Sequence, residues 1–246
     1  MINRAGDLME LKEDALDLMH DAGFAIENVT VVLDEKLPYM GHTVQVNGAP
    51  VVVVSGMALK SGMALNLLIH EFGHVYRTQS AHPSHDSGLI LSAISFVMHG
   101  KVVPKYQEEV LYAIINHLED LYSDDIFFKI FDSDRANVGT NKFFLGWIHK
   151  PVKKVKNKQD SWTNAEFLLS AAFADANLHR HNIKDVDGLI RKAVEEFLSK
   201  IDKRMSIKYN FFKNLMVNLP EKVNEKEYER LLISYLSEFL KIAKLK

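Results

Sequence analysis

Two histidines four residues apart, with a glutamate directly after the first, constrain this chain more than any other feature. The segment reads Ile69-His70-Glu71-Phe72-Gly73-His74-Val75 and lies within an apolar run. In a helix, residues four apart lie above one another on one face, so both imidazoles can reach a single metal ion. Glu71 can then accept a proton from a water molecule bound to that metal. The segment therefore predicts a helix that carries a zinc site.

Composition excludes other kinds of site and partner. The 246 residues include no cysteine, which excludes disulfides and thiolate zinc sites. A formal net charge of −2 gives no strong attraction to nucleic acid or to an anionic membrane, so neither is expected as a partner. The first ten residues carry acids where a signal peptide is apolar, and the apolar run 88–98 is too short to span a bilayer. We therefore expect a cytoplasmic protein.

The spacing of apolar residues predicts an α+β fold that is predominantly α-helical. A first helix is expected at 7–22, and Asn47-Gly48 indicates a turn between two strands of a small sheet that precedes the motif helix. The expected strands are 29–33, 43–46 and 51–54, and the later helices are 88–98, 106–128, 162–180, 185–204, 206–218 and 224–245. Residues 80–88 read as a loop, and residues 131–146 as irregular.

A lysine-rich stretch at 150–158 is the best candidate for a domain boundary. It separates a core at 1–148 from a helical C-terminal region at 159–246. That region can equally be a helical extension packed on the same domain.

The motif in its setting resembles the zincin metallopeptidases. A short sheet precedes the motif helix, and Gly73 matches their His-Glu-(Leu/Phe)-Gly-His form. The resemblance implies a zincin-like core with a small β-sheet before the HExxH helix, a Zn²⁺ cofactor, and a strand that aligns a peptide substrate. The strand at 51–54 is the candidate for that alignment.

A catalytic zinc ion needs a third protein ligand and one open position. The metzincin pattern would place a histidine six residues after His74, where the chain has Ser80. The phrase Asn116-His-Leu-Glu119-Asp120 resembles a phrase in several zincin-like families, including an uncharacterised archaeal one. This gluzincin-like resemblance implies that Glu119 is the third ligand and that Asn116 or Asp120 holds a ligand in place.

Other third ligands stay open. Gluzincins pair their ligand glutamate with an aspartate four residues later, but the fourth residue after Glu119 is Ser123. Asp120 and Asp124 do have this spacing, so the ligand can be shifted by one residue.

Three residues from other segments are weaker candidates. His82 and His85 lie in the loop after the motif helix, where they can bind the metal or stabilise an oxyanion. Glu166 begins a later helix, where the helix dipole alone favours an acidic residue.

These features predict a zinc-dependent peptidase in which Glu71 is the general base, acting on a peptide or protein substrate. The alternative is a catalytically inactive zincin-fold protein that regulates or binds partners. Glu71 is needed only for chemistry and favours the enzyme. A link to nucleic-acid signalling has only the 150–158 lysines in its support. The substrate and the oligomeric state stay open.

Overall fold

The computed structural model describes residues 4–131 and 133–244, which form two compact units. The first unit comprises the chain up to His85 together with Tyr122–Phe131, and the second comprises Asp86–Leu121 and the residues after Phe131. The chain is α+β and mostly helical, as predicted. The predicted division between 1–148 and 159–246 stays a prediction. No helix in the described ranges is both long and apolar enough to cross a bilayer.

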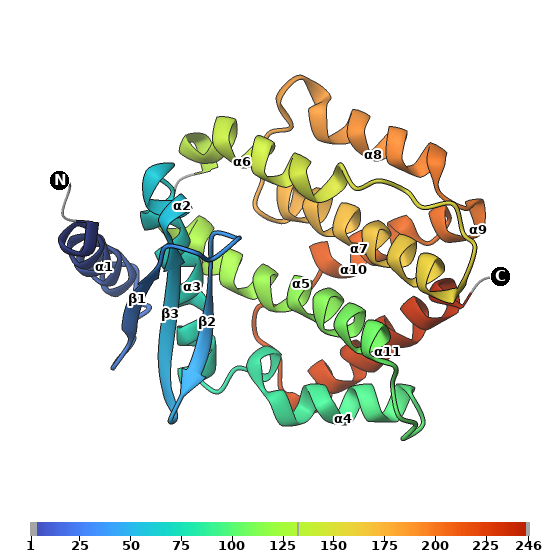
Figure 1. The fold of residues 1–246 in the computed structure, drawn as a ribbon, viewed down its shortest axis with the longest axis horizontal. Coiled ribbons are helices and arrows are strands. Elements are labelled where there is room, and N and C mark those ends of the chain that lie inside the picture. The colour runs from blue at the N-terminus through green and yellow to red at the C-terminus, as the bar shows by residue number, and fades with distance from the viewer. Residues whose placement is uncertain (1–3, 132, 245–246) are drawn as a thin grey trace. The chain divides into compact units, whose positions relative to one another are not determined.

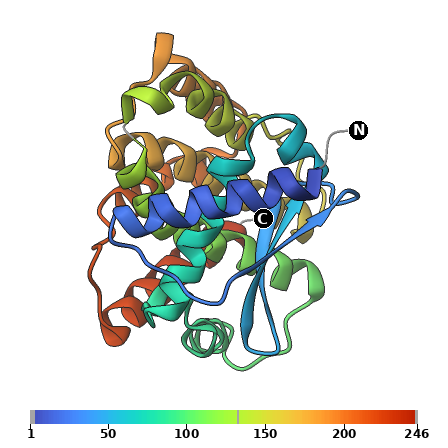
Figure 2. The same ribbon diagram turned by 90° about the vertical axis from the view of Figure 1, so that its left-hand side faces the viewer.

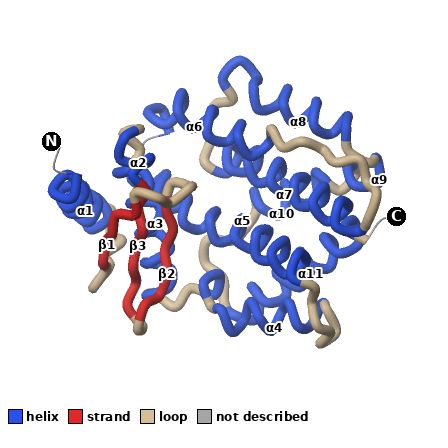
Figure 3. Tube along the Cα trace, in the orientation of Figure 1, coloured by secondary structure: helices blue, strands red, loops and turns tan. Residues whose placement is uncertain are grey.

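The first unit contains a three-stranded sheet in the order β1-β3-β2 (Figures 1 and 3). Strand β1 (Thr30–Asp34) is parallel to β3 (Ala49–Ser55), and β2 (Gly41–Val46) is antiparallel to β3. Asn47 and Gly48 have φ angles of 51° and 79°, which is the left-handed backbone that a two-residue hairpin turn requires. The three predicted strands are thereby confirmed to within a few residues.

Alternation along β3 decides which face of the sheet is buried. Val52 and Val54 are fully buried, while Val51 and Val53 are partly exposed. The buried face packs on α3 (Ala64–Gln79), and α1 (Arg4–Asp21) packs on α3 and β1, as Figure 2 shows. The core between these elements includes Leu8, Ala15, Met19, Leu68, Ile69, Phe72, Val75 and Ile126.

The predicted role of residues 51–54 in aligning a peptide is wrong. These residues belong to β3, which is the central strand and is paired on both sides, so no further strand can be added to it. The edge strand that contacts α3 is β2. The sequence pattern did not reveal this, because the order of strands in a sheet is a tertiary property.

Helix α3 packs closely against the C-terminal part of α5 (Lys105–Ile130). A Cβ atom at Gly73 would lie 3.1 Å from both Cα and Cβ of Ser123. Four residues later, Nε of the buried Arg77 donates a hydrogen bond of 3.1 Å to the backbone oxygen of Tyr122. Gly73 therefore brings the motif helix close to α5.

The described residues of the second unit form helices joined by loops and include no strand. Helix α7 is buried on most of its length, and Asn157 and Asn224 begin α7 and α11 with capping boxes. The α-helices not yet described are α2 (Gly56–Lys60) in the first unit and, in the second, α4 (Ser87–Val97), α6 (Ser133–Ile148), α7 (Lys158–Arg180), α8 (Leu189–Lys200), α9 (Lys203–Ser206), α10 (Tyr209–Val217) and α11 (Glu225–Ala243).

The prediction of an irregular segment at 131–146 is wrong, because α6 occupies most of it. Its polar first half includes asparagine and glycine, which have low helix propensity. Phe144 and Ile148, four residues apart, are each 2% exposed. Burial of this face outweighs the local propensity of the chain.

His117, on α5 in the second unit, is buried without full hydrogen bonding. Its ring stacks on Phe173 at 5.0 Å, its Nε2 is 3.5 Å from Oγ of Ser170, and its Nδ1 has no hydrogen-bond partner among the described residues. Burial lowers the pKa of His117 to about 4, outweighing the opposing effect of Asp120. The ring is therefore neutral in the folded protein at neutral pH.

Alanine at Gly73 should destabilise the protein, because its Cβ would lie 3.1 Å from Ser123, closer than an ordinary van der Waals contact, in a packed helix pair. We expect Gly73→Ala to lower the free energy of unfolding by about 1–3 kcal/mol in urea titrations. Gly146→Ala is the matched control, since Gly146 also lies in a helix but has nothing within 4 Å of an added Cβ. That control should be neutral or slightly stabilising. Equal effects of the two changes would contradict the close packing.

Acid should destabilise the wild type more than a variant without His117. Between the unfolded pKa near 6.5 and the folded pKa near 4, the unfolded chain binds a proton that the folded chain does not, so stability falls as pH falls. Relative to His117→Leu, the wild type should lose about 2 kcal/mol between pH 7 and pH 5. Urea titrations with a chelator present measure this difference. A difference that is unchanged with pH would show that His117 protonates normally.

Candidate metal centre

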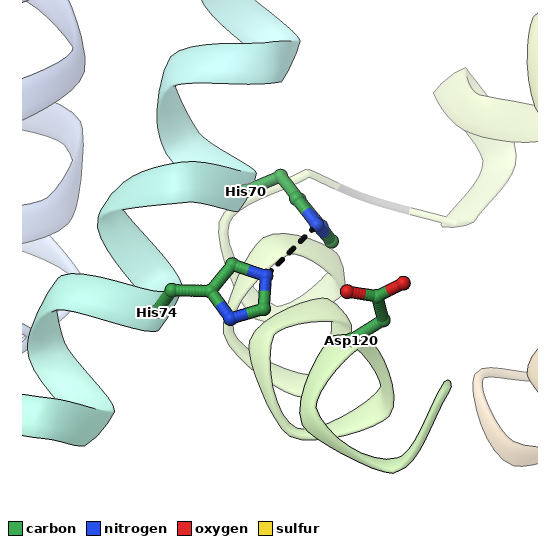
Figure 4. Close-up of side chains that lie close together, drawn as sticks. All are labelled: His70, His74 and Asp120. Atoms are coloured by element: carbon green, nitrogen blue, oxygen red, sulfur yellow. Dashed lines mark hydrogen bonds between the residues drawn. The ribbon is translucent and has the colours of Figure 1, made fainter. Parts of the chain in front are cut away.

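Helix α3 presents the two motif histidines side by side, as the sequence predicts. Their Nε2 atoms lie 3.2 Å apart (Figure 4), and both side chains are half-buried. Two nitrogen ligands at tetrahedral angles around one zinc ion, each bonded at 2.0–2.1 Å, would lie about 3.3 Å apart. The two rings therefore have the separation of a pair of zinc ligands.

The far side of each imidazole is held by a hydrogen bond. His70 Nδ1 lies 2.9 Å from Oδ1 of Asp124, a residue of α5 that is 8% exposed. A carboxylate only accepts, so the hydrogen of the neutral His70 ring is on Nδ1 and its Nε2 carries a lone pair. His74 Nδ1 lies 2.8 Å from Nε2 of His85. Contacts of this kind fix the orientation of metal-binding histidines.

Glu71 lies between the histidines in sequence, and a residue of the sheet donates a hydrogen bond to its side chain. Its side chain is 6% exposed, and Thr43 Oγ1 donates a hydrogen bond of 2.8 Å to its Oε2. Thr43 belongs to the edge strand β2 and is opposite Val52, so its side chain faces α3. Thr43 was not among the predicted site residues, although its place in the alternating segment 43–46 was a signal that could have found it.

Thr43 also has its backbone N–H and C=O groups on the open edge of β2. A two-residue hairpin makes Val46 and Ala49 a hydrogen-bonded pair, and the antiparallel pattern then alternates along β2. The N–H and C=O groups of Gly41, Thr43 and Gln45 therefore point away from β3. The position of Pro50 opposite Gln45 agrees with this pattern, because proline has no N–H to donate and Gln45 and Pro50 form a pair without hydrogen bonds.

A third potential ligand comes from α5. His70, His74 and Asp120 each offer a ligand atom, and these atoms lie within 4.8 Å of one another (Figure 4). Asp120 is 7% exposed, and Asn116 Nδ2 donates to both of its carboxylate oxygens at 3.0 Å. Helix α5 is continuous from Asp120 into the part of the first unit that carries Asp124.

The described residues thus bring Asp120 to the histidines, together with Asp124 one turn later. This is the spacing shifted by one residue that the sequence analysis left open. Glu119 is half-buried and is not part of this group, and its role as third ligand stays a prediction. Asn116 donates hydrogen bonds to Asp120, and its role in holding a metal ligand stays a prediction.

The remaining candidates lie elsewhere. His85 contacts Nδ1 of His74, on the side of the ring away from Nε2, and His82 is linked to it through Ser84. Glu166 lies on α7 in the second unit, where burial raises its pKa above the ordinary value. None of the three joins the group found among the described residues.

The donor set fits a divalent cation. Glu71, Asp120 and Asp124 are each more than nine-tenths buried, and a buried carboxylate is unfavourable unless positive charge or hydrogen bonds compensate it. Two imidazoles and a carboxylate are a ligand set that zinc enzymes use. The arrangement can therefore hold a metal ion with Glu71 beside it as a base.

One family matches almost the whole chain. The family described as "Family of unknown function (DUF5781)" matches residues 14–241, a range that contains every residue of the candidate centre. The chain belongs to this family. Searches of curated proteins and of solved structures give no match to the chain. The function proposed below is consequently inferred from the geometry of the candidate centre.

Exchange of single carboxylates should identify the third ligand. We expect Asp120→Ala to weaken zinc binding by at least about tenfold, measured by competition with a chromophoric chelator. Glu119→Ala is the matched control, one residue away on the same helix, and should bind zinc nearly as tightly as the wild type. The opposite order of effects would assign the ligand to Glu119.

Proposed function

We propose that this protein is a zinc-dependent peptidase. His70, His74 and Asp120 are the metal ligands, and Glu71 is the general base. The observation that carries the proposal is the 3.2 Å separation of the two histidine Nε2 atoms, with the buried carboxylate of Glu71 on the same helix. The resemblance of the His70–His74 motif to that of the zincins supports the same chemistry.

A bound zinc ion would supply Lewis acidity, polarising the substrate carbonyl and making a water molecule a better nucleophile. Glu71 accepts a proton from that water molecule as the water oxygen attacks the carbonyl carbon. Glu71 then delivers the proton to the nitrogen of the leaving amine as the C–N bond breaks. Thr43 holds Oε2 of Glu71 through its hydroxyl, which leaves Oε1 for the proton.

The edge strand β2 supports an extended peptide as the substrate. The backbone groups of Gly41, Thr43 and Gln45 on its open side can pair with an added strand. Thr43 contributes its main chain to this edge and its side chain to Glu71, so a peptide paired there would lie next to the general base.

Replacement of Glu71 by glutamine tests the mechanism. Glu71→Gln should retain zinc, measured by elemental analysis, and lose about 10²–10⁴-fold in the rate of peptide cleavage, measured by mass spectrometry on a peptide mixture. Glu195→Gln, on the exposed face of α8, is the matched control and should retain full activity.

Two results would contradict the proposal. Undiminished cleavage by Glu71→Gln would exclude Glu71 as the base. A zinc-loaded wild type that cleaves nothing in the mixture would favour the non-catalytic binding or regulatory protein.

A further inference from the structure

The loop after α3 folds back onto that helix, and its residue His85 contacts His74. Its single turn η1 (Pro83–His85) places Nε2 of His85 2.8 Å from Nδ1 of His74. We propose that Ser84 and His85 are positioning residues, which keep the hydrogen of His74 on Nδ1 and so leave Nε2 with a lone pair for the metal. This inference rests on the proposed metal site.

His82, Ser84, His85 and His74 form a chain of hydrogen bonds, called the relay below. The hydrogen bonds of Ser84 determine which atom donates at each step. The backbone N–H of Ser84 donates to Nδ1 of His82 at 3.2 Å, so this nitrogen carries a lone pair and no hydrogen. Oγ of Ser84 lies 2.7 Å from the same nitrogen. The one hydrogen of the hydroxyl must therefore point to His82.

The next two bonds follow from this first one. Oγ of Ser84 also lies 2.7 Å from Nδ1 of His85, and because its hydrogen is already used it accepts a hydrogen from that ring. A neutral imidazole carries only one N–H, so Nε2 of His85 is an acceptor. Nδ1 of His74 then donates to it, and Nε2 of His74 has a lone pair.

His70, the other motif histidine, has the same tautomer because of a different partner. His70 donates from Nδ1 to the carboxylate of Asp124, so its Nε2 also has a lone pair. The two Nε2 atoms face one another at 3.2 Å, and a hydrogen bond between them would require a hydrogen on one of them. The relay places both hydrogens at Nδ1 instead. Two facing lone pairs repel each other unless a cation binds between them.

The relay is anchored in the interior of the first unit. Ser84 is fully buried, and the His82 ring packs on Tyr122 of α5 with centroids 4.5 Å apart. The Tyr122 ring is itself fully buried, with the Arg77 guanidinium 5.6 Å from its centroid. These contacts fix the loop, so that the orientation of His85 is set by packing.

The contacts of His85 favour this role over the two that the sequence suggested. Its Nε2 is bonded to His74 and its Nδ1 to Ser84, so either nitrogen would have to give up its partner to bind a metal or an oxyanion. In the relay both nitrogens keep their partners.

Three variants of the full chain test the proposal. His85→Leu removes the acceptor for His74, His85→Gln can replace it with Oε1, and Ser84→Ala removes the group that orients His85. His20→Leu, an exposed histidine on α1, is the control. Tautomers are measured by ¹⁵N NMR of histidine-labelled, metal-free protein, and zinc affinity by chelator competition. Circular dichroism confirms folding.

We expect His74 to carry its hydrogen on Nδ1 in the wild type and on Nε2 in His85→Leu. Zinc affinity should fall by about 10–100-fold in His85→Leu, less in Ser84→Ala, and recover in His85→Gln. A wild-type His74 with its hydrogen on Nε2, or wild-type zinc affinity in both His85→Leu and Ser84→Ala, would overturn the inference. A wild type with the expected tautomer that binds no zinc would overturn the proposed metal site alone.

Discussion

The close approach of α3 to α5 at Gly73 is the constraint on which the candidate centre depends. A Cβ at this position would lie 3.1 Å from Ser123, so a larger residue would push the helices apart. The contact is one residue before His74, and it brings Asp124 to within 2.9 Å of His70. Packing of two helices thus sets the distance between a motif histidine and the carboxylate that orients it.

This packing also buries carboxylates, whose negative charge has to be compensated. Glu71 and Asp124 are both more than nine-tenths buried beside two histidines. Each carboxylate accepts a hydrogen bond, from Thr43 and from His70. In the tautomers that we propose, the hydrogens on Nδ1 of the histidines leave lone pairs at Nε2. A divalent cation is the ligand that such an arrangement favours, because it compensates the buried negative charge and binds both lone pairs.

Much of the fold was predictable because burial repeats with a regular period along the chain. Runs of β-branched residues and the alternation along 43–46 identified the strands. Asn47-Gly48 identified the hairpin turn, since that turn needs two residues with positive φ. Helix α6 was missed because its burial depends on Phe144 and Ile148 in contact with other helices, while its first half has polar residues typical of loops. The order of the strands could not be predicted either, since the pairing of strands depends on tertiary contacts rather than on the pattern within each strand.

The sequence by itself determined the motif helix, the face shared by His70 and His74, and the position of Glu71, because a helical repeat of 3.6 residues is local. It also limited the candidates for a third metal ligand to a few acids and histidines. Only the tertiary structure decided that Asp120 lies with the histidines, that Thr43 binds Glu71 and that His85 binds His74. These contacts join residues from separate elements, and their distances depend on how helices and strands pack rather than on spacing along the chain.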